Sequence, residues 1–219
     1  MSAVESAVIA AAGLGSRLGL GKPKCLLEFG GKSILQHQLW LLRYVPDVRV
    51  VVGFEEALVM DAVRRLRPDA IIVRNAAYRT TTTLDSYSLG ATGVRGNCLF
   101  LDGDITFDPA SFARFLDICR PDRALIGVTA LKTQDAVHVG VVDGQATWFS
   151  RERQAPHEWA NMAWIPPSWL EKPVGESVFE RLAGHLPQTA CEVESYEVDT
   201  AADYAIAEPR ALQIFREMD

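Results

Sequence analysis

An apolar run, Ala7-Val8-Ile9-Ala10-Ala11-Ala12, leads into the loop Gly13-Leu14-Gly15-Ser16-Arg17-Leu18-Gly19-Leu20-Gly21-Lys22-Pro23-Lys24. The run is too short to span a membrane and is typical of a buried strand. The loop contains four glycines, three cationic side chains and no acid. Glycines let backbone N–H groups approach an anion closely, and Arg17 and Lys24 add full positive charges. The sequence therefore predicts a polyphosphate-binding loop directly after the first strand.

Two common phosphate-binding motifs are excluded by single residues. A dinucleotide fingerprint needs glycine as its sixth residue, where this loop has Leu18. The triplet Gly31-Lys32-Ser33 resembles the end of a Walker A loop, but the glycine needed five residues earlier is replaced by Leu26. The loop thus belongs to neither class.

Composition limits the classes of partner. The chain has 219 residues, 48% of them hydrophobic, which suffices for one domain over residues 1–219. A net charge of −6 argues against nucleic acid and favours a small anionic ligand at the local cationic loop. Four cysteines without metal-binding spacing predict reduced thiols. With no leader and no membrane segment apparent, we expect a cytoplasmic protein.

Strand and helix patterns alternate through the first half of the chain. Strands are predicted at 7–12, 48–52, 70–73 and 97–101, and helices at 34–44 and 55–66. This alternation predicts a mostly parallel sheet with helices on both faces. Ligands of such sheets bind at the carboxyl ends of the strands, where the glycine loop lies.

Carboxylates follow the strand at 97–101. Asp102 and Asp104 lie on the same side of an extended chain, and Gly103 between them leaves room for a bulky ligand. Mg²⁺ prefers one or two carboxylates with phosphate oxygens and water, so this pair predicts a magnesium site. Asp108 precedes Pro109 and is expected to cap a helix. His37 is expected to be a surface or packed residue of its helix, without a catalytic role.

The second half changes character. A β-hairpin is predicted over 138–149 with its turn at Asp143-Gly144, followed by a polar loop at 150–159. Trp148, Trp159 and Trp164, with Glu152 and Glu158 nearby, could hold a cationic acceptor or could simply fill a core. We expect residues 131–187 to select the acceptor. Residues 191–198 alternate in polarity and predict a half-exposed strand at a sheet edge.

The loop resembles the signature of nucleotidyltransferases of the sugar-nucleotide pyrophosphorylase type, A-A-G-x-G-S/T-R-L/M followed by P-K. The resemblance implies a three-layer α/β/α Rossmann-like fold with a mostly parallel mixed sheet and a small β-hairpin insertion. It implies catalytic roles for Arg17 and Lys24. The residues it assigns to nucleotide binding are Ala11, Ala12, Gly13, Leu14, Gly15, Ser16, Arg17, Lys24, Thr82, Thr83, Ser86 and Asp102, although helix capping explains the hydroxyl residues equally well.

The resemblance extends to the end of the chain. Members close with I/V-D-T/S-x-x-D-Y/L, matched here by Val198-Asp199-Thr200-Ala201-Ala202-Asp203-Tyr204, whose first aspartate is a metal ligand. It therefore implies that Asp104 and Asp199 hold Mg²⁺, with Asp102 as an outer partner or a turn residue. Thr200 and Asp203 have capping-box spacing. The chain looks most like the phosphocholine cytidylyltransferase group.

This resemblance implies Mg²⁺-dependent transfer of CMP from CTP to a small phosphorylated or phosphonate acceptor, with release of pyrophosphate. Trp148, Glu152 and Trp164 are the expected acceptor residues. Threonines and Asp85 replace the group's paired asparagines before Tyr87, which keeps a sugar-1-phosphate or polyol-phosphate enzyme using UTP or GTP open. A nucleotide-binding regulatory module without turnover is the alternative of another class. The sequence says nothing about oligomeric state.

Overall fold

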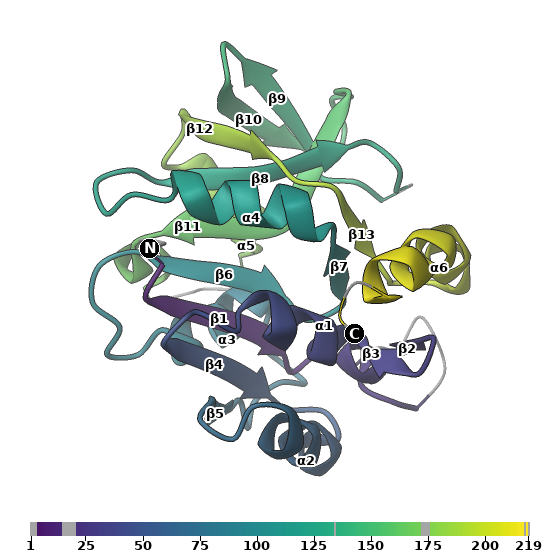
Figure 1. Cartoon of the computed structure of the whole chain (residues 1–219). Coiled ribbons are helices and arrows are strands. Elements are labelled where there is room, and N and C mark those ends of the chain that lie inside the picture. Colours follow the sequence, from purple (N-terminus) through teal and green to yellow (C-terminus); the bar gives the residue numbers. More distant parts are fainter. Residues whose placement is uncertain (1–3, 15–20, 134, 172–175, 217, 219) are drawn as a thin grey trace.

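A nine-stranded sheet runs through the centre of the molecule (Figure 1). The computed structural model describes residues 4–14, 21–133, 135–171, 176–216 and 218. The strand order is β5-β4-β1-β6-β11-β8-β12-β10-β9. The first four strands in this order are parallel: β5 (Ile71–Arg74), β4 (Asp47–Val52), β1 (Ser6–Ala11) and β6 (Cys98–Asp102). The parallel half therefore agrees with the strand and helix alternation of the sequence.

The other half of the sheet is mixed. Strand β11 joins it antiparallel to β6 and β8, and β12 runs parallel to β8. The hairpin closes at Asp143 and Gly144, whose φ angles of 50° and 75° suit an Asp-Gly turn. The strands are β8 (Leu125–Ala130), β9 (His138–Val142), β10 (Gln145–Ser150), β11 (His157–Ile165) and β12 (Gln188–Glu192).

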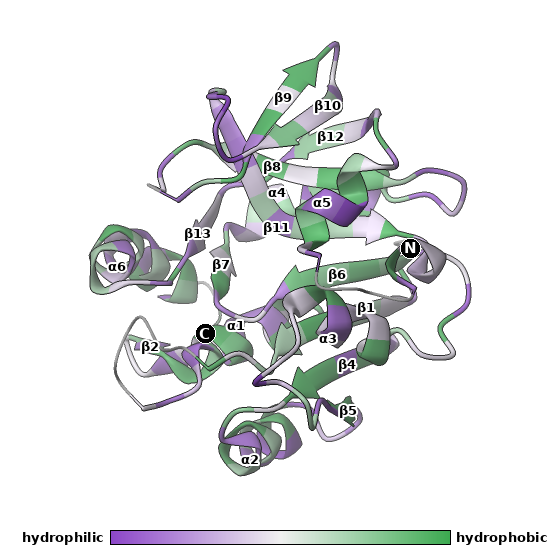
Figure 2. Ribbon diagram, turned by 180° about the vertical axis from the view of Figure 1, so that it is seen from behind, coloured by the Kyte–Doolittle hydropathy of each residue, from purple (hydrophilic) through white to green (hydrophobic). Residues whose placement is uncertain are grey.

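Helices cover both faces of the sheet, as the three-layer prediction required. One face carries α1 (Ile34–Leu41), α2 (Glu56–Leu66) and α4 (Pro109–Ile118); the other carries α3 (Thr83–Gly90) and α5 (Val178–Ala183) (Figures 1 and 2). Within β1, Ile9 packs toward the first set and Val8 toward the second, and both are fully buried. A strand that is covered on both faces buries every side chain, so its sequence is continuously apolar. This is why β1 shows no alternation of polar and apolar residues.

Two short two-stranded sheets and the last helix lie beside the main sheet. Strand β7 pairs with β13, and β2 pairs with β3. Helix α6 packs its apolar face against β2 and the start of α1, through a cluster containing Phe29, Ile34 and Phe215. The elements are η2 (Lys24–Leu26), β2 (Glu28–Phe29), β3 (Lys32–Ser33), β7 (Ile105–Phe107), η3 (Pro167–Leu170), β13 (Ser195–Glu197) and α6 (Ala201–Arg216).

The expectation of one edge strand over 191–198 is wrong. This stretch is divided between β12, which lies inside the main sheet between β8 and β10, and β13, which pairs with β7. The chain leaves the sheet where Val193 is buried and the Glu194 N–H donates to Ser111 Oγ at 3.1 Å. The polarity alternation thus reflects two strands in different sheets.

Smaller differences concern element ends. Helix α1 ends at Leu41, and Tyr44, which was expected to be helical, is 84% exposed. The polar stretch after the hairpin becomes strand β11 at His157. Within the described ranges, no helix is both long enough and apolar enough to cross a bilayer.

Candidate active site

Two cavities open at the carboxyl edge of the sheet. The β1 cavity, of about 640 Å³, is lined by the loops after β1 and β5 and by the turn after β6. The β11 cavity, of about 610 Å³, is lined by β11, the loop after β8 and the start of α6. The cavities share one wall, formed by Thr82, Thr83, Asp102, Arg151, Glu197 and Asp199. A ligand in one cavity can therefore meet a ligand in the other at this wall.

The pairing of β7 with β13 builds the acidic part of the shared wall. Glu197 lies opposite Ile105, and the Val198 N–H donates to the Asp104 carbonyl oxygen at 3.0 Å. Two acids at i and i+2, Asp102 and Asp104, precede β7, and two more, Glu197 and Asp199, lie at the end of β13 and just after it. Four carboxyl groups, two from the middle of the sequence and two from near its end, thus gather at one place.

Lys24 bridges two of these carboxylates. Its Nζ donates to Asp104 Oδ2 at 2.9 Å and forms an ion pair with Asp199. Burial alone would lower the pKa of Lys24, but the two ion pairs outweigh it and raise the pKa. Lys24 is therefore fully charged. It is placed by the helical turn η2, which follows Pro23.

Asp102 and Glu197 titrate abnormally. Burial, reinforced by the charge of Asp104, raises the pKa of Asp102 to about 7, although the Tyr87 hydroxyl donates to its Oδ1 at 2.5 Å. Burial and the charges of Asp104 and Asp102 raise the pKa of Glu197 to about 8. Asn161 Nδ2 donates to Glu197 Oε2 at 3.0 Å. Both pKa values are raised mainly by burial and, after it, by the charges of the neighbouring carboxylates.

Gly103 is required by the backbone of β1. Its N–H donates to the Ala10 carbonyl oxygen at 2.9 Å, and a Cβ built on Gly103 would lie 2.7 Å from that oxygen. From the sequence, glycine was expected at position 103 because it leaves room for a ligand. Although Gly103 lines the β1 cavity, the close approach to β1 is the stronger constraint.

The acidic cluster fits a hard divalent cation. Asp104 and Asp199 both reach the same ammonium group, so one cation can contact both carboxylates. No group of three or more His, Cys, Asp or Glu side chains within the described residues has metal-binding geometry. Two carboxylates suffice for Mg²⁺, which takes its other ligands from phosphate and water. The donor set therefore suits Mg²⁺ only together with a phosphate ligand.

Most of the residues expected to bind nucleotide line the β1 cavity. They are Ala11, Ala12, Gly13, Leu14, Lys24, Thr82, Thr83, Ser86 and Asp102, together with the expected metal ligands Asp104 and Asp199. Gly15, Ser16 and Arg17 lie outside the described residues.

Thr82, Thr83 and Ser86 all line the β1 cavity, and two of them also form structural hydrogen bonds. Thr82 forms a capping box with Asp85, whose Oδ2 accepts from the Thr82 N–H at 2.7 Å, and the Thr82 hydroxyl also donates to the Glu176 carbonyl oxygen at 3.1 Å. The buried Ser86 hydroxyl accepts from Asn75 Nδ2 at 3.2 Å. Thr83 has no role in the capping box and lines both cavities.

None of the three expected acceptor residues lines either cavity. Trp164 is 2% exposed in the core, where its Nε1 donates to the Arg120 carbonyl oxygen at 2.9 Å. Trp148 packs so closely over Gly140 that a Cβ there would lie 2.0 Å from the ring nitrogen. Glu152 is exposed beyond the hairpin. For Trp164, the core-filling alternative is therefore the one that the packing supports, whereas Trp148 is half-buried on the hairpin.

Residues other than these three line the β11 cavity. Glu158 and Trp159, which follow one another on β11, both line the β11 cavity and are 4% and 7% exposed. Arg151 and Glu197 in the shared wall and Asn161 beside them were missed by the sequence analysis. Only Glu197 had a usable signal, because it stands two residues before Asp199 as Asp102 stands before Asp104.

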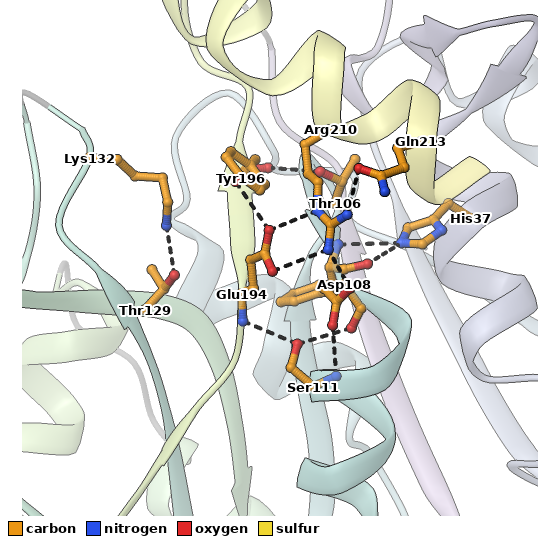
Figure 3. Close-up of polar contacts among 11 residues, drawn as sticks. His37, Thr106, Asp108, Ser111, Thr129, Lys132, Glu194, Tyr196, Arg210 and Gln213 are labelled. Carbon is orange, nitrogen blue, oxygen red and sulfur yellow. Dashed lines mark hydrogen bonds and ion pairs between the residues drawn. The ribbon is translucent and has the colours of Figure 1, made fainter. Parts of the chain in front are cut away.

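Side chains behind the wall hold β13 in place (Figure 3). Arg210 of α6 forms ion pairs with Asp108 Oδ1 at 2.9 Å and Glu194 Oε1 at 2.8 Å. Asp108 also caps α4 as predicted, accepting from the Ser111 N–H at 2.9 Å. His37 is a packed residue, with Nε2 2.9 Å from the Phe107 carbonyl oxygen and burial lowering its pKa to about 4.

The remaining minor predictions also agree with the structure. Asp203 Oδ2 accepts from the Thr200 N–H at 2.8 Å, as the capping-box spacing required. All four cysteines are free thiols.

Comparison with known proteins places this geometry in a family. The family model of the MobA-like NTP transferase domain matches residues 7–191. The chain belongs to this family. The MobA-like match includes the glycine loop, Lys24 and Asp104 but ends before Asp199, which therefore joins the site on its ion pair with Lys24 and on the β7–β13 pairing.

Two curated relatives are similar to parts of this MobA-like chain. The CMP-5'-(3-aminopropyl)phosphonate synthase of Streptomyces rubellomurinus is 30% identical over 200 residues, covering 81% of this chain and 31% of that protein. The 2-C-methyl-D-erythritol 4-phosphate cytidylyltransferase of Neisseria meningitidis is 34% identical over 80 residues, covering 36% of this chain and 35% of that protein. The chain thus spans about a third of the length of the curated relatives it matches.

Solved structures share the fold. The inositol-1-phosphate CTP transferase from T. maritima superposes with a TM-score of 0.81 at 16% identity, covering 100% of this chain and 98% of that one. The CTP:phosphocholine cytidylyltransferase from Streptococcus pneumoniae gives 0.76 at 19%, covering 94% and 98%. The expected resemblance to nucleotidyltransferases is confirmed by the family match, and these solved structures share the fold of the MobA-like chain.

Proposed function

We propose that the protein transfers CMP from CTP to a small phosphate or phosphonate acceptor and releases pyrophosphate. The observation that supports this is the shared wall: the β1 cavity, beside the glycine loop, and the β11 cavity meet at Asp102, Glu197 and Asp199. A donor and an acceptor bound in separate cavities would react there. The relatives named for CMP or cytidylyl transfer support CTP as the donor.

The reaction needs placement and charge neutralisation more than a nucleophilic side chain. An acceptor oxygen, already anionic, attacks the α-phosphorus of CTP while the bond from that phosphorus to the bridging oxygen breaks. Asp104 and Asp199 would hold Mg²⁺, which supplies positive charge to the phosphate oxygens. Lys24 would turn from these carboxylates to the phosphates, and Arg17 would add charge from the loop.

The β11 cavity supports an acceptor that carries an amino group. At its shared wall stands Arg151, a cation suited to the acceptor phosphate or phosphonate. Glu158 and Trp159 also line the cavity, with Glu158 Oε2 accepting from the Thr133 hydroxyl at 2.7 Å. A buried carboxylate and an aromatic ring that line the same cavity suit an ammonium group. Glu158 and Trp159 thus replace Trp148, Glu152 and Trp164 in the proposal.

Lys132 is a second cation in the β11 cavity. Its Nζ donates to Thr129 Oγ1 at 2.6 Å (Figure 3) and also to the Ala130 carbonyl oxygen at 3.0 Å. Burial lowers its pKa. If Lys132 bound the acceptor phosphate, Lys132→Met would raise KM for every acceptor, whether or not the acceptor has an amine.

The test is a pyrophosphate-release assay on the full chain with Mg²⁺, four nucleoside triphosphates and a panel of acceptors. The panel holds phosphocholine, 2-aminoethylphosphonate, 3-aminopropylphosphonate, inositol 1-phosphate and glucose 1-phosphate. We expect release only with CTP and an amine-bearing acceptor. A preference for UTP or GTP with a sugar phosphate would instead support the alternative enzyme. Nucleotide binding without any release would support a regulatory module.

Glu158→Gln tests the acceptor end. We expect KM for the amine acceptor to rise about tenfold or more while KM for CTP stays unchanged, since one charge-assisted contact is lost at the acceptor alone. Glu152→Gln makes the same change outside the cavity and should leave both constants unchanged. Equal constants for wild type and Glu158→Gln would remove Glu158 from the acceptor site.

A further inference from the structure

Gln38 of α1 contacts the turn that carries Asp104, although it lines neither cavity. Its side-chain Nε2 donates to the Asp102 carbonyl oxygen at 2.8 Å and to the Ile105 carbonyl oxygen at 2.8 Å. Gln38 is fully buried. The two accepting residues stand on either side of Gly103 and Asp104, so one amide group ties both ends of the turn.

The orientation of this amide is fixed by its surroundings. If the amide were reversed, Oε1 would face two carbonyl oxygens, which are acceptors only. The nitrogen must therefore face the turn. Oε1 then points away, and it is buried without a hydrogen-bond partner among the described residues.

An unpaired buried oxygen destabilises the folded state, so stability alone does not favour glutamine at this position. The glutamine amide, however, supplies two N–H donors, and both point to carbonyl oxygens of the same turn. On its other side the turn is held by the Gly103 N–H, which donates to the Ala10 carbonyl oxygen at 2.9 Å. Between these contacts the backbone of Asp104 has little freedom.

The neighbouring residue holds the far end of β7. His37 Nε2 lies 2.9 Å from the Phe107 carbonyl oxygen, and His37 Nδ1 is, like Gln38 Oε1, a buried atom without a partner among the described residues (Figure 3). Two consecutive residues of α1 thus contact the backbone just before β7 and at both ends of β7. Helix α1 fixes β7, and β7 fixes the acidic cluster through its pairing with β13.

We propose that Gln38 is a positioning residue that directs the Asp104 carboxylate toward the metal and triphosphate. This inference rests on the proposed function, in which Asp104 and Asp199 hold Mg²⁺. The amide acts on the backbone of the turn and does not touch the substrate. Its loss loosens the direction of the carboxylate while leaving the glycine loop and both cavities in place.

Gln38→Met is the decisive variant, because methionine keeps the length of the side chain and removes both donors. Gln36→Met makes the same substitution on the same helix, where Gln36 enters the helix cap only through its backbone N–H. For each protein we would measure binding of Mn²⁺ together with CTP by electron paramagnetic resonance, the Mg²⁺ concentration for half-maximal turnover, and thermal unfolding.

We expect Gln38→Met to weaken Mn²⁺ binding and to raise the half-maximal Mg²⁺ concentration about tenfold, the effect typical of residues that orient metal ligands. KM for CTP at saturating Mg²⁺ should stay unchanged, and Gln36→Met should match wild type throughout. A Gln38→Met protein that melts at lower temperature but keeps the wild-type metal dependence would show a structural role only and would overturn the inference.

A second variant covers loss of folding. If Gln38→Met is unfolded at the assay temperature, Gln38→Asn retains both donors but withdraws them by one methylene group, and the same metal shift is expected. Unchanged metal dependence in Gln38→Asn would also count against the inference. Failure of the proposed function looks different: wild type itself would release no pyrophosphate, while the Mn²⁺ comparison between the variants could still be made.

Discussion

Single residues carry the chemistry of the site, and Asp104 is the clearest case. Asp104→Asn removes a charge that both pairs with Lys24 and, in the proposed mechanism, holds Mg²⁺. We expect the turnover rate to fall at least 100-fold, a loss of about 3 kcal/mol of transition-state stabilisation. The rate of pyrophosphate release measures this loss of turnover.

The matched control for this prediction is Asp61→Asn, which removes an exposed aspartate of α2 that pairs with Arg64. It should leave the rate unchanged. Near-normal turnover in folded Asp104→Asn protein would remove Asp104 from the active site.

His37 gives a prediction about pH. Burial lowers its pKa from 6.5 to about 4, so the unfolded chain takes up a proton before the folded protein does. The stability that neutral His37 contributes is complete above pH 6.5 and is lost as pH falls toward 4, with a slope of up to about 1.4 kcal/mol per pH unit.

His37→Gln can keep a donor near the Phe107 carbonyl oxygen and does not titrate. Urea unfolding at several pH values should show the free energy of unfolding of wild type falling relative to His37→Gln between pH 6.5 and 4. Parallel curves for the two proteins would show that His37 titrates normally in the folded state.

The sequence predicted the residues that follow a strand within a motif and missed those brought in from elsewhere. Lys24, Asp104 and Asp199 were found because local patterns and a family resemblance mark them. Arg151 lies in a polar loop without periodicity, and Gln38 acts through two backbone carbonyls. Such roles depend on distant contacts that leave no local signal.

At the scale of elements, helix α4 is tied to α6 through its cap. Asp108 accepts from the Ser111 N–H and pairs with Arg210. Asp108→Ala should lower the free energy of unfolding by about 2 kcal/mol. It removes the helix cap and one of the two ion pairs of the partly buried Arg210, which keeps only its ion pair with Glu194. Chemical denaturation measures the change.

Asp117→Ala is the control, because it removes an exposed aspartate from the carboxyl end of the same helix, where a negative charge is unfavourable. It should leave stability unchanged or slightly increased. If both variants lost the same stability, the tie between α4 and α6 would contribute nothing.

The elements differ in how well sequence patterns predict them. Strands β1, β4 and β6 are short apolar runs between turn residues, and each was found within a residue or two. Residues 191–198 were misassigned because period-two alternation does not reveal which sheet a strand joins. The pairing of β13 with β7 is decided by contacts such as Glu194 with Arg210, which join distant parts of the chain.

For the whole molecule, the two cavities and their shared acidic wall predict that nucleotide and metal stabilise the fold together. At CTP concentrations about 100 times the dissociation constant, binding adds about 2.7 kcal/mol, which corresponds to a rise in Tm of about 5–10 °C for a chain of this size. We expect this rise with CTP and Mg²⁺ together and a much smaller one with CTP alone, because the carboxylates of Asp104 and Asp199 repel a triphosphate whose charge no metal ion compensates.

Differential scanning fluorimetry of wild type and Asp104→Asn measures this coupling. The variant should lose the part of the rise that depends on Mg²⁺. A rise with CTP that is independent of Mg²⁺ in wild type would mean that the acidic cluster does not take part in nucleotide binding.

Transfer of a nucleoside monophosphate from a donor in one cavity to an acceptor in the other is tested most directly with labelled CTP. The full chain is incubated with Mg²⁺, an aminoalkylphosphonate and CTP labelled at the α-phosphate, and the products are separated. We predict that the label enters an acceptor-dependent product while unlabelled pyrophosphate leaves, and that Asp104→Asn forms almost none of this product. Label that remains in CTP or appears only in free CMP, whichever acceptor is supplied, would contradict the account.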